Sequence, residues 1–373
     1  MPGTIRVGID ATPLLGPRTG IGRYVSALLG ALTTEPGGED LALRGTAFTV
    51  RGRVELARAL PPGVPAVGGP VPARLLRQSW SHGGPPPVEW LCGRVDVFHA
   101  TNFVLPPRRR AAGVLTVHDL GFLRVPETLS AANLIYRELV PRGVREAAMT
   151  LTPSETVRQE LLAEFGVEPG RVAVTPLGVD ASWFTPVPAS TDDPADEILH
   201  GPPFVLFVGA VEPRKGLPTL LEAQRRCPPG TAPRLVIAGP AGWGAELDTA
   251  GAGLDVVRTG FLTDIRLRRL LMGAAAVALP SRYEGFGLPV LEALASGTPV
   301  LASDLPVLRE VGGEHARYLP VGDPDAWAEA LAAAPGRRER HDPAPGISWA
   351  RRFTWGRCAE KTRFAYRAAA AAG

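Results

Sequence analysis

Short apolar runs alternate with helix-like stretches along this chain, and the alternation occurs in two separate series. Such alternation favours a parallel sheet covered by helices, because a parallel connection must cross back over the sheet. We therefore predict an α/β fold with two doubly wound, Rossmann-like domains. The expected strands are 6–9, 95–98, 114–117 and 149–152 in the first series and 204–208, 234–238, 256–257, 276–279 and 300–302 in the second, with a helix at 24–32.

A proline- and aspartate-rich connector, 185–203, separates the two series, and exposed linkers between domains have this composition. We expect an N-terminal domain over 1–185, with the closing helix 355–373 packing back on it, and a C-terminal domain over 200–354. Ligands of such folds bind beyond the carboxyl ends of the strands, so a site is expected in a cleft where two sheets face each other. Another proline- and glycine-rich stretch, 61–87, predicts a long surface loop.

Charge and hydropathy exclude several classes of protein. The net charge of +3 gives no general signal for nucleic-acid binding. The longest apolar run, 270–279, is well short of the roughly 20 residues that span a bilayer, and the first ten residues do not resemble a secretory signal. We therefore expect a cytoplasmic protein without a nucleic-acid partner. The run Arg108–Arg110 predicts a solvated loop, with peripheral contact to anionic lipid at the inner membrane face left open as the alternative.

Two residue types are used sparingly. Only Lys215 and Lys361 are lysines among the forty basic residues. Lysine is a compact donor on a flexible stem, so Lys215 is a candidate for reaching one phosphate oxygen, whereas chance explains Lys361. The cysteines lack the paired spacing of zinc or disulfide-exchange motifs, so we expect them to be small buried residues: Cys92, Cys227 and Cys358.

The segment 280–293 carries the strongest local signal. A strand ends before it, Glu284 follows in a glycine-rich loop, and a short helix is expected to begin near Pro289 and to stop by Gly297. Glycines allow the backbone to approach a ligand, and the free N–H groups at a helix start attract anions. Glu292, about one turn into the helix, has the chemistry to accept bonds from a ribose diol, with a helix-dipole or salt-bridge role as the alternative.

Two other patterns argue against common cofactor sites. The glycine spacing at Gly16, Gly20 and Gly22 matches neither the dinucleotide nor the P-loop motif. Asp323-Pro324-Asp325 is formally a metal-type D-x-D motif, but an aspartate before an alanine-rich stretch caps a helix, here expected over 326–334. We therefore predict no cofactor and no catalytic metal.

Glu284 and Glu292 show E-x7-E spacing around Gly-Phe-Gly-Leu-Pro, and this segment resembles the signature of glycosyltransferase family four. Segments 10–24, 98–102, 116–120, 209–216 and 353–355 resemble the same family in the same order. The resemblance implies the GT-B fold and a retaining enzyme that moves a sugar from a nucleotide-sugar donor to a hydroxyl acceptor. Such an acceptor is a glycan, a lipid-linked sugar or a small molecule.

The resemblance also implies residue roles. Arg214 and Lys215 are expected to neutralise the donor phosphates, and His118 to lie near the acceptor, where a buried structural histidine bonded to a backbone carbonyl is the alternative. Gly20 and Gly22 are expected near the diphosphate and the acceptor. The remaining expected donor contacts are Glu284 to the sugar, Glu292 to the ribose, and the loop residues Gly285, Phe286, Gly287 and Leu288. The catalytic set is His118, Arg214, Lys215 and Glu284.

One position departs from the family pattern, since Ala210 follows Gly209 where many relatives have arginine, which leaves Arg214 as the candidate for that charge. No residue is clearly placed as a nucleophile, so we expect same-face attack with the departing phosphate taking the acceptor proton. The opening segment is most similar to mannosyltransferases, which favours GDP-mannose. The alternatives are a UDP-hexose or UDP-N-acetylhexosamine donor, a phosphorylase or epimerase on the same frame, or a non-catalytic sugar-nucleotide-binding protein.

Overall fold

The computed structural model describes residues 3–16, 20–37, 40–49, 52–69, 73–81, 83–130, 133–188, 195–242, 251 and 253–372. The chain divides into two compact units. The first consists of Met1–Phe122, Ala131–Gly178 and Thr354–Gly373, and the second of Leu123–Ser130 and Val179–Phe353. Each unit contains one parallel sheet with helices packed on it, which confirms the predicted α/β class.

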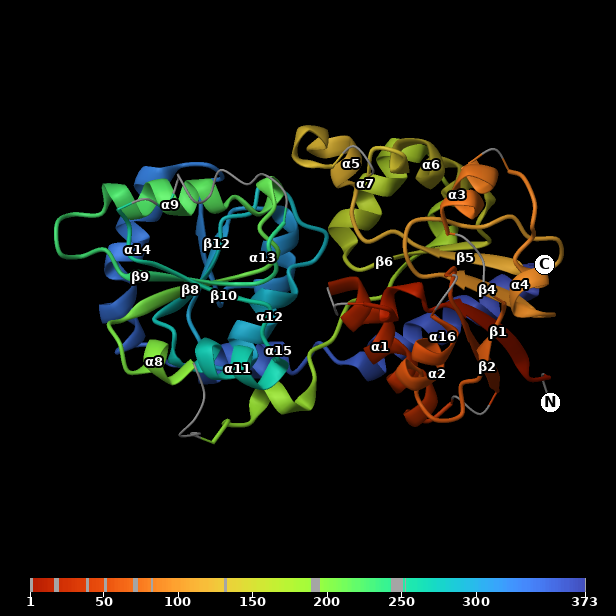
Figure 1. The fold of residues 1–373 in the computed structure, drawn as a ribbon, viewed down its shortest axis with the longest axis horizontal. Helices are drawn as coiled ribbons and strands as arrows, with labels where there is room; N and C mark the ends of the chain where they lie inside the picture. Colours follow the sequence, from red (N-terminus) through yellow and green to blue (C-terminus); the bar gives the residue numbers. More distant parts are fainter. Residues whose placement is uncertain are drawn as a thin grey trace. The chain divides into compact units, whose positions relative to one another are not determined.

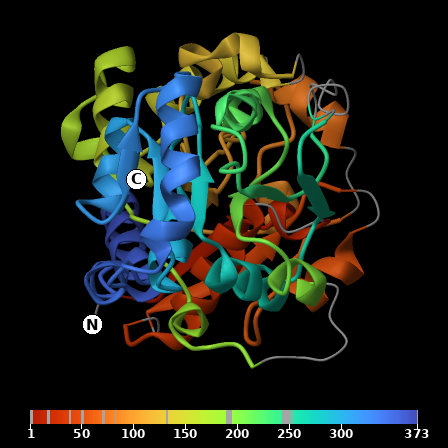
Figure 2. The same ribbon diagram turned by 90° about the vertical axis from the view of Figure 1, so that its left-hand side faces the viewer.

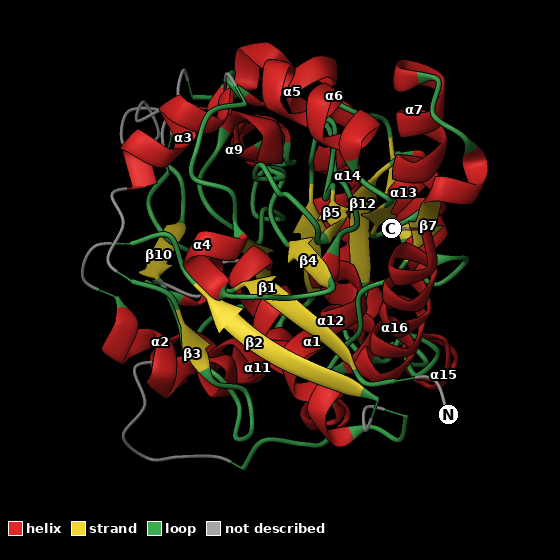
Figure 3. Ribbon diagram, turned by 90° about the vertical axis from the view of Figure 1, so that its right-hand side faces the viewer, coloured by secondary structure: helices red, strands yellow, loops and turns green. Residues whose placement is uncertain are grey.

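In the first unit, seven strands of the described chain form a parallel sheet in the order β3-β2-β1-β4-β5-β6-β7 (Figure 1, Figure 3). The order grows from β1 toward β3 on one side and from β4 toward β7 on the other, so the direction of winding switches between β1 and β4. The strands are β1 (Ile5–Asp10), β2 (Leu41–Thr46), β3 (Ala66–Val67), β4 (Val97–Ala100), β5 (Ala112–Thr116), β6 (Met149–Thr152) and β7 (Val172–Val174).

Helices cover both faces of this sheet. Helix α1 (Gly20–Thr34) packs against α16 (Trp355–Ala372), and α16 contacts strands β4 to β7. Helices α6 (Tyr136–Glu146) and α7 (Glu155–Phe165) contact β5, β6 and β7 from the opposite face (Figure 1). The shorter helices in this half of the sequence are α2 (Arg53–Ala59), α3 (Ala73–Ser81), α4 (Glu89–Cys92), α5 (Gly121–Arg124), and the 3-10 turns η1 (Thr12–Leu14), η2 (Pro126–Thr128) and η4 (Pro169–Arg171).

In the second unit, six described strands form a parallel sheet in the order β10-β9-β8-β11-β12-β13 (Figure 2). The chain winds from β8 to β10 in one direction and from β11 to β13 in the other, so the switch lies between β8 and β11. The strands are β8 (Phe204–Val208), β9 (Arg234–Ala238), β10 (Val256–Gly260), β11 (Ala276–Leu279), β12 (Val300–Ser303) and β13 (Arg317–Leu319).

The core of the second unit forms where α9 (Leu217–Arg226) and α14 (Pro324–Arg338) pack together on one face of the sheet. Trp327 is completely buried there among leucines and alanines of both helices and the strands below. Helix α12 (Leu288–Ala295) packs on β11 and β12 and against α15 (Ala344–Ala350). The remaining helices are α8 (Ala195–Leu199), α11 (Asp264–Gly273), α13 (Pro306–Gly312), and the 3-10 turns η5 (Ala181–Phe184) and η6 (Pro213–Lys215).

Four regions differ from the sequence expectation. The stretch 61–87 is not one long loop, because it contains β3 and α3, with residues 70–72 and 82 outside the described part. The expected connector begins inside the second unit: Trp183 of η5 is buried there, α8 packs on α11, and residues 189–194 lie outside the described part. The run at 108–110 is only partly solvated, since the Arg108 side chain is 14% exposed. Cys227 is half-buried, whereas Cys92 and Cys358 are buried as expected.

None of the helices that the structure describes combines the length and the apolar character needed to cross a membrane.

Candidate active site

The winding switch of the second sheet brings two loops together. One loop follows β8 and ends at Gly216, and the other follows β11 and begins at Pro280. The Arg282 amide donates to the Arg214 carbonyl at 2.8 Å, and a Cβ added to Gly216 would lie 1.9 Å from the Pro280 carbonyl oxygen. Gly216 also has a φ of +68°, so both its conformation and its surroundings require glycine. Two motifs that are about 70 residues apart in sequence are therefore neighbours at the position where ligands of such sheets bind.

Glu284 is the centre of this loop pair and is 6% exposed. Lys215 Nζ and Ser281 Oγ each donate to its Oε1 at 2.7 Å, and Arg214 Nη1 donates to its Oε2 at 3.3 Å. Burial alone would raise the pKa of Glu284, but the charges of Lys215 and Arg214 overcome it and lower that pKa to about 2. The carboxylate is therefore ionised at every physiological pH.

Arg214 and Lys215 are held in place by the loop that carries Glu284. Arg214 also donates to the Tyr283 carbonyl at 2.9 Å, and Glu212 lies 3.8 Å from its guanidinium. The two cationic side chains remain 14% and 17% exposed. They are thus fixed in direction yet still reachable, which is the arrangement that electrostatic stabilisation of a developing anion needs.

Helix α12 begins at Leu288, next to the predicted Pro289. In its first turn Pro289 has no N–H group, and the Val290 amide donates to the Gly287 carbonyl at 2.9 Å. Gly287 before it has a φ of +98°, and a Cβ there would lie 2.6 Å from a Leu308 methyl group. Phe286 is 5% exposed and its ring packs edge-on against Phe353, so any donor contact from position 286 would come from the backbone.

Glu292 lies within α12 and is 1% exposed. Every residue from Val290 to Ala295 is buried, so the carboxylate is on a helix without a solvated face. Its contact with a donor ribose stays a prediction, and so does the alternative, a helix-dipole or salt-bridge role of Glu292.

His118 lies in the first unit, two residues beyond the end of β5, and is 9% exposed. Its Nε2 donates to the Thr101 carbonyl at 2.8 Å, and the rings of Tyr24 and Phe103 pack edge-on against it. Burial lowers the pKa of His118, with the Thr101 bond and Asp119 opposing that effect. This bond to a backbone carbonyl is the one expected of a buried structural histidine. Because a carbonyl only accepts, Nε2 carries the proton. The Nδ1 atom of the neutral ring is then an acceptor for a hydroxyl.

The two glycines expected near the diphosphate open α1 in the first unit, and residues 17–19 before them lie outside the described part. A Cβ at Gly22 would lie 2.7 Å from the Pro13 carbonyl oxygen, so Gly22 is needed for the close packing of α1 on η1. A Cβ at Gly20 would meet nothing within 4 Å, so packing gives no reason for glycine there. Their roles toward a ligand stay predictions.

Sequence reasoning missed a buried polar network in the first unit. His99 on β4 bonds to Tyr366 of α16 and to Thr116 of β5, each at 2.7 Å, and Thr116 bonds to Tyr24 at 3.1 Å. Burial lowers the pKa of His99 to about 3, so its ring is neutral. His99 and Tyr366 are 267 residues apart, and no local pattern could pair them. Ser281, also missed, stands three residues before Glu284, a spacing that was readable.

The D-x-D segment has the capping role that the sequence predicts. Asp323 accepts from the backbone amides of Asp325 and Ala326 at the start of α14, and Asp325 pairs with Arg226 at 2.9 Å. Within the described ranges, no group of three or more His, Cys, Asp or Glu side chains is arranged to hold a metal ion. That the reaction needs no metal stays a prediction.

Two family models match the chain, one described as Glycosyltransferase Family 4 over residues 19–183 and one as glycosyl transferases group 1 over residues 202–334. The chain is 31% identical over 282 residues to O-antigen chain mannosyltransferase B of Escherichia coli, across 73% of this chain and 74% of that protein. The chain belongs to glycosyltransferase family 4. It is an enzyme that transfers a glycosyl group.

This glycosyltransferase is also 31% identical over 304 residues to D-inositol 3-phosphate glycosyltransferase of Nocardia farcinica, across 75% of this chain and 65% of that protein. Among solved structures it is similar to Anabaena HepE in complex with UDP and glucose, with a TM-score of 0.70 at 17% identity over 96% of this chain and 98% of that chain. It is also similar to sucrose-phosphate synthase of Thermosynechococcus elongatus, with a TM-score of 0.71 at 21% identity over 99% of this chain and 100% of that chain. These similarities confirm the predicted GT-B fold.

Proposed function

We propose that this enzyme transfers a hexosyl group from a nucleotide-sugar donor to a hydroxyl acceptor with retention of the anomeric configuration. The observation that carries the proposal is the ion cluster at the winding switch of the second sheet, where buried, ionised Glu284 contacts Lys215 and Arg214. A fixed carboxylate suits sugar hydroxyls, which are hydrogen-bond donors, and the two cations suit a diphosphate.

The chemistry follows from the charges. As the bond between the anomeric carbon and the phosphate oxygen breaks, negative charge grows on the diphosphate. Lys215, Arg214 and the amides at the start of α12 stabilise that charge and so promote departure. The acceptor oxygen forms its new bond on the same face, and its proton passes to the departing phosphate oxygen. The reaction then needs neither a metal nor an enzyme nucleophile.

GDP-mannose is our first choice of donor. The E. coli relative named as a mannosyltransferase supports mannose. The HepE structure with UDP and glucose supports the alternative, a UDP-hexose or UDP-N-acetylhexosamine. We propose a glycan, a lipid-linked sugar or a hydroxylated natural product as acceptor, and contact with a membrane surface remains a prediction from the sequence.

A nucleotide panel followed by product analysis tests the proposal. Thermal unfolding is measured with GDP, UDP and ADP, where a ligand at 100 times its Kd adds about 2.7 kcal/mol of stability. Release of nucleotide is then measured with GDP-mannose, UDP-glucose and UDP-N-acetylglucosamine, with and without candidate acceptor sugars. NMR of the anomeric centre gives the configuration of the product.

Each result has a definite meaning. Stabilisation by GDP and turnover of GDP-mannose support the first choice, whereas UDP-specific stabilisation selects the alternative donor. An inverted product contradicts the proposed same-face mechanism. Binding without any transfer or hydrolysis, in the wild type as in a Lys215→Ala control, would support the non-catalytic alternative.

A further inference from the structure

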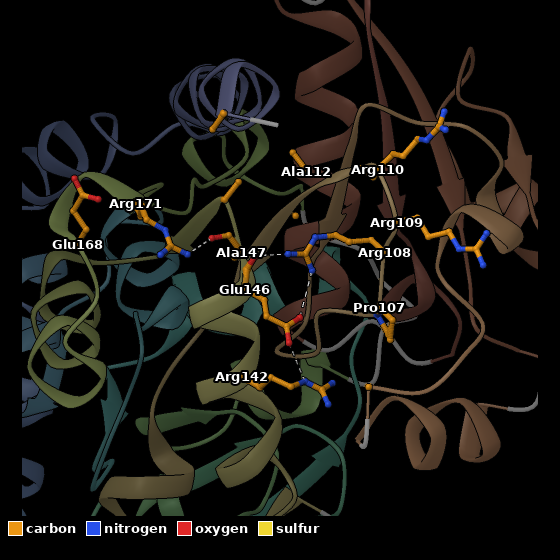
Figure 4. A pocket seen from close by; sticks show the side chains of 15 residues that line it. Pro107, Arg108, Arg109, Arg110, Ala112, Arg142, Glu146, Ala147, Glu168 and Arg171 are labelled. Carbon is orange, nitrogen blue, oxygen red and sulfur yellow. Dashed lines mark hydrogen bonds and ion pairs between the residues drawn. The ribbon is translucent and has the colours of Figure 1, made fainter.

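A pocket of about 740 Å³ lies at the amino ends of β5, β6 and β7, within the first unit. The segments that precede these strands line it, together with Ala372 at the end of α16 (Figure 4). Parallel strands place all their amino ends at one edge of a sheet. The pocket is therefore at the opposite edge from His118, which follows the carboxyl end of β5, and it uses none of the residues assigned to donor or acceptor.

The lining is rich in arginine. An excess of one sign of charge on a concave surface concentrates the electric field and attracts ions of the opposite sign. The charged residues that line the pocket are Arg108, Arg109, Arg110, Arg142 and Arg171 against Glu146 and Glu168.

Glu146 is shared between two of these guanidinium groups. It lies 3.7 Å from Arg108 Nη1 and 3.7 Å from Arg142 Nε, and Figure 4 shows both arginines directed toward it. Both distances are longer than a hydrogen bond, and Glu146 is 46% exposed, so each pairing is weak. Burial lowers the pKa of Arg108, and the charges of Glu146 and Glu89 oppose that effect. Arg108 and Arg142 thus lie near the same half-exposed carboxylate, in a lining that holds more arginines than glutamates.

Arg171 is fixed by neutral partners. Its Nη2 donates to the Arg145 carbonyl at 2.8 Å and also to the Ala147 carbonyl, so the guanidinium is held in direction while keeping its full charge. Within the described residues, no carboxylate forms an ion pair with Arg171 or with exposed Arg110. The five arginines of the lining outnumber its two glutamates, so the pocket carries an excess of positive charge.

We propose that this pocket binds a phosphate-bearing molecule through Arg108, Arg142 and Arg171. The planar fork of donors on arginine matches phosphate oxygens two at a time. The volume is in the range of small-molecule sites and exceeds that of a bare phosphate, so the ligand is a phosphate or diphosphate group attached to a larger body. That group belongs either to a soluble metabolite or to an anionic phospholipid.

Calorimetric titration with inorganic pyrophosphate tests the pocket. Arg142→Gln removes one guanidinium from the surface of α6 and is expected to weaken binding by about tenfold or more. Glu146→Gln removes the competing carboxylate and is expected to tighten binding, so the two variants act in opposite directions. The matched control is Arg337→Gln with Arg340→Gln, which takes charge from exposed positions at the end of α14. Melting curves of all variants establish that they are folded.

The donor site provides the second control, because pyrophosphate also resembles a donor diphosphate. Lys215→Ala leaves the pocket intact and is expected to retain the binding that Arg142→Gln weakens. Pyrophosphate binding that Lys215→Ala abolishes and Arg142→Gln leaves unchanged would assign the anion to the donor site and overturn the proposal. Equal affinity for wild type, Arg142→Gln and Glu146→Gln, or no binding to the wild type, overturns it as well.

Sedimentation with vesicles separates the two sources of phosphate. Vesicles of phosphatidylcholine alone are compared with vesicles that also contain phosphatidic acid. Binding to the acidic vesicles that pyrophosphate displaces and Arg142→Gln weakens identifies a lipid headgroup. Pyrophosphate binding with no vesicle binding identifies a soluble ligand. Vesicle binding that is insensitive to both pyrophosphate and Arg142→Gln reflects general surface charge and contradicts a pocket.

Discussion

Replacing Glu284 by glutamine removes the buried anion of the ion cluster and keeps the size of the side chain. The pKa of Glu284 lies at about 2 in the folded protein against an ordinary value of 4.5. At about 1.4 kcal/mol per pH unit, this difference is worth about 3 kcal/mol of folding free energy at pH 7. Glu284 is 6% exposed, so solvent screening does not reduce this figure much. We therefore expect Glu284→Gln to destabilise the second unit by about 3 kcal/mol at pH 7.

The sign of the pH dependence follows from the lowered pKa. The folded protein holds the proton on Glu284 less tightly than the unfolded chain does, so the stabilisation is complete above pH 4.5 and is lost as the pH falls toward 2. The difference in unfolding free energy between the wild type and Glu284→Gln is expected to decrease from about 3 kcal/mol at pH 7 to about 2 kcal/mol at pH 3.5.

Native-state hydrogen exchange of the β8 and β11 amides measures this difference, because these strands lie on either side of the winding switch and report on the second unit alone. The control is Glu222→Gln, which removes an exposed carboxylate paired with arginines on α9 and is expected to change exchange much less. Ser281→Ala keeps the Glu284 charge, loses one hydrogen bond and should cost about 1 kcal/mol. The reasoning would be refuted if Glu284→Gln lost no more stability than Glu222→Gln, or if its loss of stability grew as the pH falls.

Three further predictions concern catalysis. Lys215→Ala should lower turnover by about 100-fold or more because it removes one stabiliser of the leaving group, and a rise in the donor KM alone would contradict that role. EDTA should leave the initial rate within a factor of about two, and a loss that manganese or magnesium restores would show that a metal takes part. His118→Ala should slow transfer to the acceptor while nucleotide affinity, measured by calorimetry, stays nearly the same. Because burial lowers the pKa of His118, its ring should stay neutral and the rate should show no titration of this group between pH 7 and 8.

The strands with continuous apolar runs were predictable. The expected ranges 149–152, 204–208, 234–238 and 276–279 coincide with β6, β8, β9 and β11, each of which has a paired strand on both sides. The strands that the sequence did not reveal are the edge strands β3, β7 and β13, and β2, which is second from the edge and only partly buried. An edge strand buries less of its surface and so needs no uniform apolar run.

The candidate site was also predictable only in part. Glycine and proline marked the loop that carries Glu284, whereas Lys215 was singled out by the scarcity of lysine and Arg214 by the family resemblance. The sequence did not predict that Lys215 and Arg214 converge on Glu284, since those contacts depend on the pairing of β8 with β11. Likewise, the bond between His118 and the Thr101 carbonyl depends on the pairing of β4 with β5. Long-range strand pairing was the missing information in both cases.

The surroundings of position 215 favour lysine, of which the chain has only one other, Lys361. Gly209, with a φ of +151°, lies close enough to Lys215 that a Cβ there would be 3.8 Å from Lys215 Cε. Ala210 follows it, so no arginine side chain enters from this turn. The narrow stem of lysine runs beside Gly209 and ends on one oxygen of Glu284, while Arg214 donates to the other oxygen and to the Tyr283 carbonyl. Lys215→Arg should therefore fail to restore turnover although it keeps the charge, because a planar, forked guanidinium does not reproduce the single 2.7 Å contact of the ammonium with Glu284 Oε1. Recovery of wild-type turnover in Lys215→Arg would show that charge alone matters at this position.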